Sequence, residues 1–449
     1  MLQTFASLRH PNYRLWFFVG LVANIGLWAK RVGQDWMVLT YLTDYSATAV
    51  GISVAMQFAP VLFLSPYAGV LADRFDKRKL LIVTSTGLGV LAFVQGALVL
   101  AGTVTLNQTY LIAFLGGCVA AIENPARQTF VSELVPADSV PNAIGLNVSA
   151  FNGARLIGPG VAGFMLAAWG PGEVFMVTGV TFVISIAALA AMNPAKLFPQ
   201  PAAPRVKGQM REAIKYVRGR ADIQIIMVVI SVISLVALNF QLNSALMSRV
   251  VFGLGPGEFG ILGSVMAIGS LAGSLWAARS KTPPRTRMVL VSAFAFGAAL
   301  GVSAMAPTFT FYVISTIPIG IAAMILITAA NASLQTSVEP EMRGRVMALY
   351  MMMFLGPTPL GSPLVGWIGE EFGARAAIWV GAIGTMGIAL AGAIWAHRRW
   401  HPTYRLERGT RWPHLVIEHP ELGCCVEPIE QTVQAGASVD GACAERVKP

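Results

Sequence analysis

Long apolar runs alternate with short polar loops along almost the whole chain, and this alternation limits what the chain can fold into. A helix needs about 20 consecutive apolar residues to cross a hydrocarbon core of ~30 Å, and twelve runs of about that length can be marked. They lie at 15–42, 48–71, 80–102, 109–129, 142–167, 174–193, 222–247, 258–279, 288–306, 309–335, 346–369 and 376–396. Because backbone groups in lipid must be satisfied within the chain, the sequence predicts an all-α membrane protein with twelve transmembrane helices.

The composition supports this prediction and indicates an orientation. Hydrophobic residues make up 55% of the chain and charged residues only 12%, against about a quarter charged in a typical soluble domain. The net charge of +10 does not indicate a nucleic-acid partner, because the basic residues are scattered through short loops. If the N-terminus is cytosolic, most Lys and Arg fall in the two tails and in the loops that lead from an even-numbered run to the next run. Arg249 and Arg375 fall in outward loops. This bias predicts two cytosolic termini, and the absence of a cleavage site predicts a retained first helix.

Short matches recur between the two halves of the chain at offsets of 203 to 207 residues. They are Gly69 and Leu71 with Gly273 and Leu275, Gln128 and Thr129 with Gln335 and Thr336, and Gly163 and Gly170 with Gly366 and Gly373. We therefore expect two pseudo-symmetric bundles of six helices each. In transporters built from such repeats, the substrate site lies near the bilayer midplane between the halves.

The repeat divides the chain into four predicted parts. They are an N-terminal bundle at 1–193, a cytosolic linker at 194–221, a C-terminal bundle at 222–396 and a partly disordered cytosolic tail at 397–449. In the linker, apolar residues from Met210 to Val217 recur at helical spacing, which predicts an amphipathic helix on the cytosolic leaflet. A mobile linker with accidental periodicity is the alternative. The adjacent Cys424 and Cys425 of the tail lack metal-ligand spacing, so no metal is predicted, and one short strand is expected through 415–417.

Four polar residues share one face of the first run. Asn24, Trp28, Arg31 and Asp35 recur every three to four positions, and Arg31 and Asp35 are one turn apart and able to pair. An ionisable group at this depth costs ~2.5 to 3.5 kcal/mol on insertion scales, so such groups usually face a cavity and mark a transport path. The alternative is that Asp35 lies near the outer interface and only neutralises Arg31.

A second group of charges lies in runs 109–129 and 142–167. Glu123 and Arg127 are four residues apart, and the buried Arg155 requires a partner, for which Glu123 is the candidate. A purely structural pair that holds these two helices together is the alternative. The C-terminal half has no ionisable residue well inside a run, so proton coupling is expected in the N-terminal half. The expected residues are Asp35, Arg31, Glu123, Arg127 and Arg155.

The C-terminal half contributes neutral polar groups. With Met351, Met352 and Met353, they are expected to form an adaptable, mostly apolar cavity for a bulky organic solute, although Met and aromatic residues more often serve packing. The predicted cavity residues are Trp28, Asn239, Gln241, Asn243, Asn331 and Gln335.

Six charges lie in the tight turn that follows the second run, from Asp73 to Lys79. The stretch from Gly69 to Lys79 resembles the first cytosolic loop of the major facilitator superfamily, Gly-x-Leu-Ala-Asp-Arg-x-Gly-Arg-Lys, with Asp76 where Gly is usual. We expect a cytosolic latch in which Asp73 faces the positive N-terminus of the helix after Arg345 and pairs with Arg74 or Arg78. In the second half Ala277 stands where Asp73 does, so no mirrored latch is expected.

The run 142–167 carries a second resemblance. Its residues Gly145, Gly158, Pro159 and Gly163 resemble the small-residue motif of the superfamily's drug antiporters, with Ala at two glycine positions; ordinary close packing is the alternative. Together with Trp36, the stretches 123–128 and 155–159 resemble the bacterial branch of enterobactin-type siderophore exporters and macrolide efflux pumps. The resemblance covers roughly residues 8 to 400. The Arg-x-x-Gln-Gly pattern of other drug antiporters is missing. The residues that form the usual proton relay therefore cannot be assigned in this chain by resemblance.

The resemblance implies a function. It predicts a secondary transporter of the bacterial inner membrane that exports amphiphilic organic solutes, drug-like or siderophore-like, by alternating access, as a monomer and by proton antiport. No cofactor and no nucleic acid are implied. The chain has no nucleophile–base pair, metal spacing or phosphate loop, so an enzyme is not predicted. A non-transporting receptor on the same fold and a proton-coupled uptake symporter are the alternatives.

Overall fold

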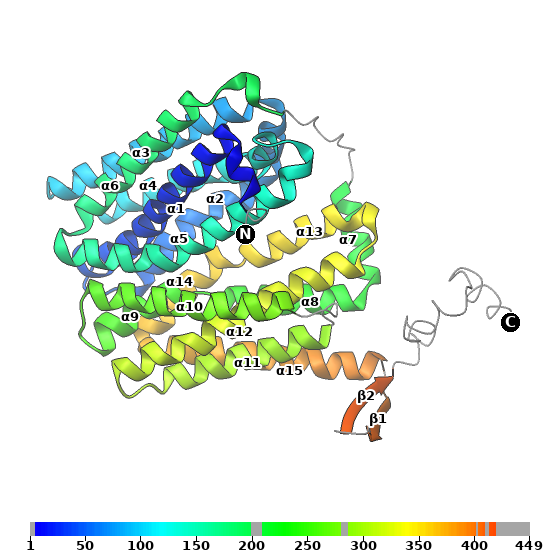
Figure 1. Cartoon of the computed structure of the whole chain (residues 1–449). Coiled ribbons are helices and arrows are strands. Elements are labelled where there is room, and N and C mark those ends of the chain that lie inside the picture. Colours follow the sequence, from blue (N-terminus) through cyan, green and yellow to red (C-terminus); the bar gives the residue numbers. More distant parts are fainter. Residues whose placement is uncertain (1–4, 199–208, 280–285, 401–402, 409–412, 419–449) are drawn as a thin grey trace. The chain divides into compact units, whose positions relative to one another are not determined.

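The computed structural model describes residues 5–198, 209–279, 286–400, 403–408 and 413–418, and helices account for most of them (Figure 1). Residues Met1–Ala389 form one compact unit and Leu390–Pro449 a second. Both predicted six-helix bundles therefore lie largely within the first unit. The predicted boundaries at 193, 221 and 396 stay predictions.

The N-terminal half consists of six long helices joined by short turns. They are α1 (Pro11–Met37), continued by the π-helical turn η2 (Val38–Leu42), α2 (Ala47–Arg74), α3 (Lys77–Leu100), α4 (Leu106–Phe130), α5 (Val140–Ala168) and α6 (Pro171–Ala191). Four short 3₁₀ turns flank them. These are η1 (Ala6–Arg9), η3 (Val131–Glu133), η4 (Ala137–Ser139) and η5 (Pro194–Lys196).

The linker and the C-terminal half have more, shorter helices. They are α7 (Gln209–Gly219), α8 (Ala221–Val236), α9 (Phe240–Leu246) with the π-helical turn η6 (Met247–Val251), α10 (Pro256–Arg279), α11 (Thr286–Ala304), α12 (Phe309–Ser337), α13 (Pro340–Leu355), α14 (Thr358–Glu371) and α15 (Ala374–Trp400). Helix α7 occupies the predicted amphipathic segment. In the second unit, strands β1 (Thr403–Arg408) and β2 (Pro413–Glu418) pair antiparallel, and β2 includes the predicted strand.

Ten helical segments of the described chain have the length and hydropathy of a membrane span. Helix α5 is also long enough, with 29 residues, but three asparagines and Arg155 make it more polar. Helices α13 and α14 are each too short, although together they fill one predicted run. Helices thus occupy all twelve predicted runs, and the all-α membrane fold is confirmed.

Two of the predicted runs are divided rather than continuous. Run 222–247 is interrupted between α8 and α9, where the Asn239 side-chain amide donates to the Leu235 carbonyl oxygen (3.2 Å). That contact satisfies a carbonyl which a continuing helix would satisfy through the backbone. Run 346–369 is interrupted between α13 and α14 at Gly356 and Pro357, where proline has no N–H to donate.

The two halves repeat one another in detail. Thr105 caps the N-terminus of α4 and Thr308 caps that of α12, each through its hydroxyl oxygen. Gly170 and Gly373 precede α6 and α15 with φ of 97° and 91°, a region that favours glycine. Both pairs are 203 positions apart, as in the sequence repeat. The first helices of both halves also end in π-helical turns, η2 and η6.

The halves meet through two pairs of helices, α2 with α14 and α5 with α10, which lie side by side in Figure 1. We call the end of the bundle where α1 begins the proximal end, and the end where α1 finishes and α2 begins the distal end. At the proximal end an apolar core joins α1, α4, α5 and α6 around Tyr13, Trp16 and Phe130. The Tyr13 hydroxyl donates to the Ala143 carbonyl oxygen (2.8 Å).

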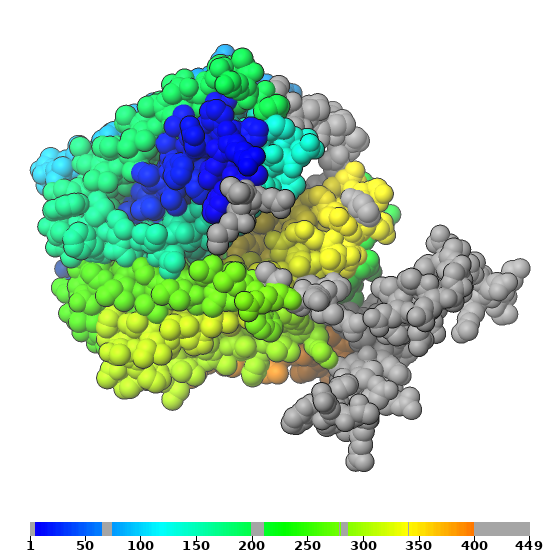
Figure 2. All heavy atoms as spheres, in the orientation of Figure 1, coloured from blue at the N-terminus to red at the C-terminus, as the bar shows by residue number. Residues whose placement is uncertain are grey.

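The N-terminal segment packs on the start of α5. The buried Ser7 hydroxyl donates to Asn142 Oδ1 (2.7 Å), and the Ser7 backbone N–H donates to the same oxygen (3.0 Å). Figure 2 shows the N-terminal residues in dark blue on the surface of this half. These contacts fix the entry into α1, the helix that carries Arg31 and Asp35.

Candidate functional site

Helices α1 and α5 approach each other closely at the level of Trp28. A Cβ added to Gly158 would lie 2.5 Å from Trp28 Cβ, so only glycine permits this approach. The rings of Trp28 and Phe151 are 6.4 Å apart. Phe151, Arg155 and Gly158 are separated by four and three positions and share one face of α5. That face of α5 therefore carries Arg155 next to the aromatic pair.

Arg31 lies among aromatic rings rather than beside a carboxylate. Its guanidinium carbon is 5.2 Å from the ring centroid of Trp28 and 5.8 Å from that of Phe58 on α2, which are cation–π distances. Of the ion pairs in the described part of the chain, none joins Arg31 to Asp35. The two side chains, which the sequence places within pairing distance, therefore form no ion pair here, and the guanidinium lies over the rings.

Asp35 is 2% exposed, and its Oδ1 has no hydrogen-bond partner. The residues on either side make contacts to other helices. Gln34 Nε2 donates to Ser53 Oγ on α2 (2.7 Å), and the Trp36 ring stacks on Phe259 of α10 with centroids 5.7 Å apart. Asp35 therefore lies at a three-helix contact that includes both halves.

Glu123 and Arg127 form an ion pair within α4. Arg127 Nη2 and Nε donate to Glu123 Oε1 at 2.8 and 3.2 Å, and the guanidinium carbon lies 5.0 Å from the Trp16 ring centroid. Glu123 is 4% exposed, and its Oε2 has no partner. The expected pairing of Glu123 with Arg155 is not formed, because the local i,i+4 geometry places Arg127 at the carboxylate.

Arg155 reaches across to the C-terminal half. Its Nη1 lies 3.8 Å from Met324 Sδ on α12, and the residue is half-buried. None of the ion pairs among the described residues includes it. A thioether is a weak acceptor without charge, so the guanidinium has no anionic partner among the residues that the structure describes.

The predicted cavity residues of the C-terminal half make different contacts. Ser362 Oγ donates to Asn239 Oδ1 (2.7 Å), and Gln335 donates to Asn331 along α12. Asn243 is 4% exposed, with an unpartnered Oδ1, and Gln241 is half-buried. Met351, Met352 and Met353 on α13 are each more than 40% exposed. Their joint role as a substrate cavity stays a prediction.

Two residues of the predicted latch, Gly69 and Asp73, lie in the stretch 65–73, whose side chains are outside the described part of the structure. Arg74 is exposed. Arg78 Nε and Nη2 donate to the carbonyl oxygens of Leu189 (2.6 Å) and Ala190 (2.7 Å). The last carbonyls of a helix lack intrahelical partners, so Arg78 closes the C-terminus of α6 within its own half.

Asp76, which departs from the family pattern, has a structural role that the sequence analysis missed. Its Oδ1 accepts from the Lys79 backbone N–H (3.0 Å) and caps α3. An Asp directly before a helical run is a favoured N-cap residue, and this was the signal available in the sequence.

The glycines of the predicted motif on α5 differ in their surroundings. A Cβ on Gly163 would lie 2.8 Å from Gly260 Cα on α10, so this position permits close contact between the halves. Gly158 permits the contact with α1 described above. Around Gly145 nothing lies within 4 Å of an added Cβ.

Hydrogen bonds at the distal end join the two halves and were not anticipated from the sequence. Glu370 Oε2 at the end of α14 accepts from Ser46 Oγ (2.8 Å) and from the Thr48 backbone N–H (3.0 Å). Arg249 Nη2 donates to Tyr45 Oη (2.9 Å). The hydrogen bonds with Thr48 and Ser46 lower the pKa of Glu370. No local pattern reports such contacts, because the partners are more than 200 residues apart.

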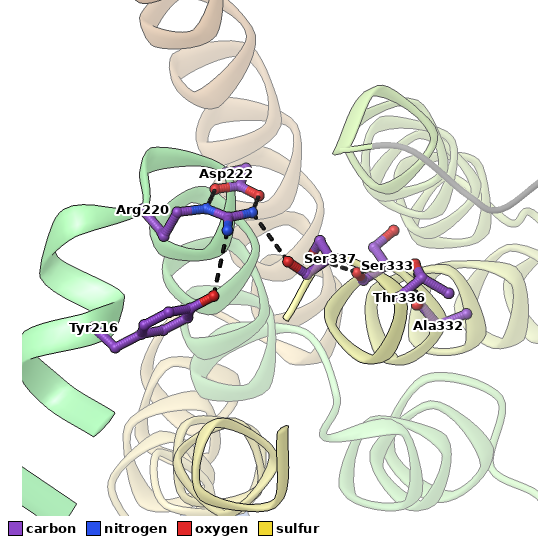
Figure 3. Close-up of polar contacts among 7 residues, drawn as sticks. All are labelled: Tyr216, Arg220, Asp222, Ala332, Ser333, Thr336 and Ser337. Atoms are coloured by element: carbon purple, nitrogen blue, oxygen red, sulfur yellow. Dashed lines mark hydrogen bonds and ion pairs between the residues drawn. The ribbon is translucent and has the colours of Figure 1, made fainter. Parts of the chain in front are cut away.

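Helix α7 is attached to the C-terminal half (Figure 3). Arg220, between α7 and α8, donates to both carboxylate oxygens of Asp222 (3.0 and 2.7 Å), to Tyr216 Oη (3.3 Å) and to the Ser337 carbonyl oxygen at the end of α12 (3.1 Å). The hydrogen bond with Asp222 raises the pKa of Arg220. Arg345 of α13 pairs with Glu212 of α7.

Two related halves of long apolar helices, which meet through α2 with α14 and α5 with α10, are the arrangement of membrane transporters of the major facilitator fold. The chain belongs to the transmembrane secretion effector family, whose model matches residues 2–428. The predicted resemblance to the siderophore-exporter and macrolide-efflux branch is thereby confirmed, and the chain is not an enzyme.

Three relatives match most of the chain. The staphyloferrin A transporter of Staphylococcus aureus is 26% identical over 84% of this chain and 94% of its own length. Macrolide efflux protein A of Streptococcus pyogenes is 22% identical over 85% and 96%. The enterobactin exporter EntS of Citrobacter koseri is 22% identical over 85% and 91%.

Solved structures share the fold at low identity. A nucleoside transporter NupG variant has a TM-score of 0.67 at 13% identity and covers 86% of this chain and 99% of its own. A bacterial homologue of the lysosomal transporter Spinster, in an inward-facing and occupied conformation, has a TM-score of 0.64 at 15% identity over 87% and 97%. These likenesses concern the fold alone.

Proposed function

We propose that this chain exports amphiphilic organic solutes, drug-like or siderophore-like, by alternating access and in exchange for protons. The relatives named for staphyloferrin A, macrolides and enterobactin support a solute of this kind. The proposal includes a bacterial plasma membrane, a monomer, and a proximal end that faces the cytosol, in accord with the distribution of Lys and Arg.

The distribution of contacts between the halves carries the proposal. In the described part of the chain, the hydrogen bonds between the halves lie at the distal end, through Glu370 and Arg249, apart from the Arg155 contact with Met324 near the middle. A bundle held together at one end is the arrangement that alternating access requires, since the other end is then free to open. In the proposed orientation this state is closed to the outside.

Asp35 is the group we assign to proton coupling. Among the described residues this buried carboxylate forms no ion pair, so it can bind and release a proton without breaking one. Glu123, by contrast, is held by Arg127. Because Asp35 is flanked by the contacts of Gln34 and Trp36 to other helices, a change in its charge acts where the halves meet.

The test is gradient-driven flux in proteoliposomes. The probes are 2-naphthalenesulfonate and naphthyltrimethylammonium, an anionic and a cationic amphiphile whose charge does not change with pH. Vesicles that are acidic inside should accumulate at least one probe when the proximal face is outside. Asp35→Asn should remove the dependence on the pH gradient, whereas the exposed carboxylate control Asp138→Asn should keep it. Accumulation only with the gradient reversed would indicate uptake, and undiminished gradient-driven flux in Asp35→Asn would contradict the coupling assignment.

A further inference from the structure

The middle of the N-terminal half contains more positive than negative charge. Lys30 is 9% exposed, and Arg31 and Arg155 are half-buried. Asp35 is the carboxylate that remains for these three cations, because Glu123 is occupied by Arg127. None of the three cations takes part in an ion pair among the described residues.

Such an excess requires an explanation inside a membrane. A buried cation is stable only when an opposite charge or a set of acceptors compensates for its lost hydration. Arg31 is partly compensated by the ring faces of Trp28 and Phe58. Within the described part of the chain, the polar contact of Arg155 is a thioether sulfur at 3.8 Å, which leaves most of its five donors unused there.

One aromatic pair lies next to both arginines, to Arg31 by contact and to Arg155 by helical spacing. Arg31 is over Trp28, and Trp28 packs against Phe151. Arg155 follows Phe151 by one helical turn on the same face of α5. Phe151 is 44% exposed, so its ring is accessible beside the guanidinium. An aromatic or apolar body can pack on these rings while an anionic group reaches the arginines.

The direction of Arg155 also fits a site between the halves. Met324 belongs to α12, so the guanidinium extends out of the N-terminal half toward the C-terminal half. In transporters of repeated halves, solutes bind at that interface. A guanidinium presents a planar fork of donors that matches a carboxylate or another oxyanion in two parallel hydrogen bonds.

We propose that Arg155, with Arg31 beside it, binds a carboxylate or comparable oxyanion of the transported amphiphile, whose ring or apolar part packs on Trp28 and Phe151. This inference rests on the proposed export function and names the solute class as anionic amphiphiles. The bound anion supplies the negative charge that the protein itself lacks at this point. Arg155 then serves as a solute-binding group, and Asp35 alone carries the exchanged proton.

Binding to the full-length protein in nanodiscs of zwitterionic lipid tests the proposal. The probes are 2-naphthalenesulfonate, its neutral sulfonamide and naphthyltrimethylammonium, which share one ring system and differ in charge. The wild-type protein should bind the sulfonate at least tenfold more tightly than the sulfonamide. Arg155→Met should abolish this preference, Arg31→Met should reduce it, and Arg155→Lys should retain part of it. Arg218→Gln, on the exposed surface of α7, is the matched control and should bind like the wild type.

Equal binding of the sulfonate and the sulfonamide by the wild-type protein would overturn the proposal, and so would an undiminished preference in Arg155→Met. Circular dichroism and thermal unfolding of each variant show whether Arg155→Met is folded, and Arg155→Lys provides a second readout if it is not.

Transport of the same probes separates this inference from the export function. If a probe is exported but the wild-type protein binds the sulfonate no more tightly than the sulfonamide, the anion site fails and the export function stands. If the sulfonate binds through Arg155 but no probe moves against its gradient, the anion site stands and the export function fails.

Discussion

The backbone of Pro159 in α5 touches Gly260 in α10 so closely that a Cβ on Gly260 would lie 2.6 Å from the Pro159 carbonyl oxygen. The equivalent crossing of the two halves, between α2 and α14, is equally close. A Cβ on Gly51 in α2 would lie 2.3 Å from the carbonyl oxygen of Ser362, the residue before Pro363 in α14. The halves therefore meet backbone to backbone at two equivalent points, each next to a helix-interior proline.

Gly260→Ala should disturb the contact between the halves. The added methyl group overlaps a carbonyl oxygen, and overpacking of this kind typically costs ~1–3 kcal/mol. We expect a lower unfolding temperature and at least a tenfold lower rate of gradient-driven transport. The matched control is Gly257→Ala on the same helix, where nothing lies within 4 Å of the new Cβ. Equal behaviour of the two variants would contradict a tight crossing at Gly260.

Glu370 makes closure of the distal end sensitive to pH. Its pKa is lowered by the hydrogen bonds with Thr48 and Ser46. The stability that Glu370 contributes to the closed distal end is therefore complete above the ordinary glutamate pKa. It is lost as the pH falls through the lowered pKa. Glu370→Gln should reproduce the acid state at neutral pH. Because the residue is exposed, we expect amide hydrogen exchange at 43–50 to rise only roughly two- to fivefold. Unchanged exchange in both acid and the variant would oppose this role.

The ion pair of Glu123 and Arg127 should matter for stability. Arg127→Ala leaves a buried carboxylate without its partner, which typically costs ~3–5 kcal/mol. Arg345→Gln breaks the pair with Glu212, whose side chain is 62% exposed, and should cost ~1 kcal/mol or less. Thermal unfolding in one detergent compares the two variants. A larger loss of stability in Arg345→Gln would contradict the greater importance of the buried pair.

The proposed latch at the proximal end predicts a kinetic effect without loss of fold. Asp73→Asn should leave the protein inserted and folded but slow transport, because the latch stabilises one of the two states that must interconvert. Ala277→Asp, at the related position of the second half, is not expected to slow it in the same way. Wild-type turnover of Asp73→Asn in proteoliposomes would contradict the latch.

The sequence was sufficient for the features that depend on local pattern. Run length and hydropathy predicted the helices, and repeated glycines predicted two related halves. Competition between nearby groups was harder to foresee. Arg127 takes the carboxylate of Glu123 that was expected for Arg155, and Arg31 lies over aromatic rings without an ion pair to Asp35. For the helix break before Thr358, the adjacent Gly356 and Pro357 were an available signal that hydropathy alone concealed.

Contacts between the halves were beyond the reach of local reasoning. Glu370 meets Thr48 only because the two bundles assemble. Nothing in the residues around either position indicates the other, and a helix-terminal glutamate is ordinary by itself. The contact of Arg155 with Met324 of α12 likewise depends on how the two halves assemble, which no spacing within one helix reveals.

The most direct measurement of alternating access is a reversible cross-link at the distal end. Tyr45 and Arg249 contact each other between the halves. In a variant without the four native cysteines, Tyr45→Cys and Arg249→Cys are joined by a reducible bis-methanethiosulfonate linker. Transport in proteoliposomes should stop on cross-linking and recover on reduction, while each single-cysteine variant stays active after the same treatment. Full transport by completely cross-linked protein would contradict the account, because the distal end would then not need to open.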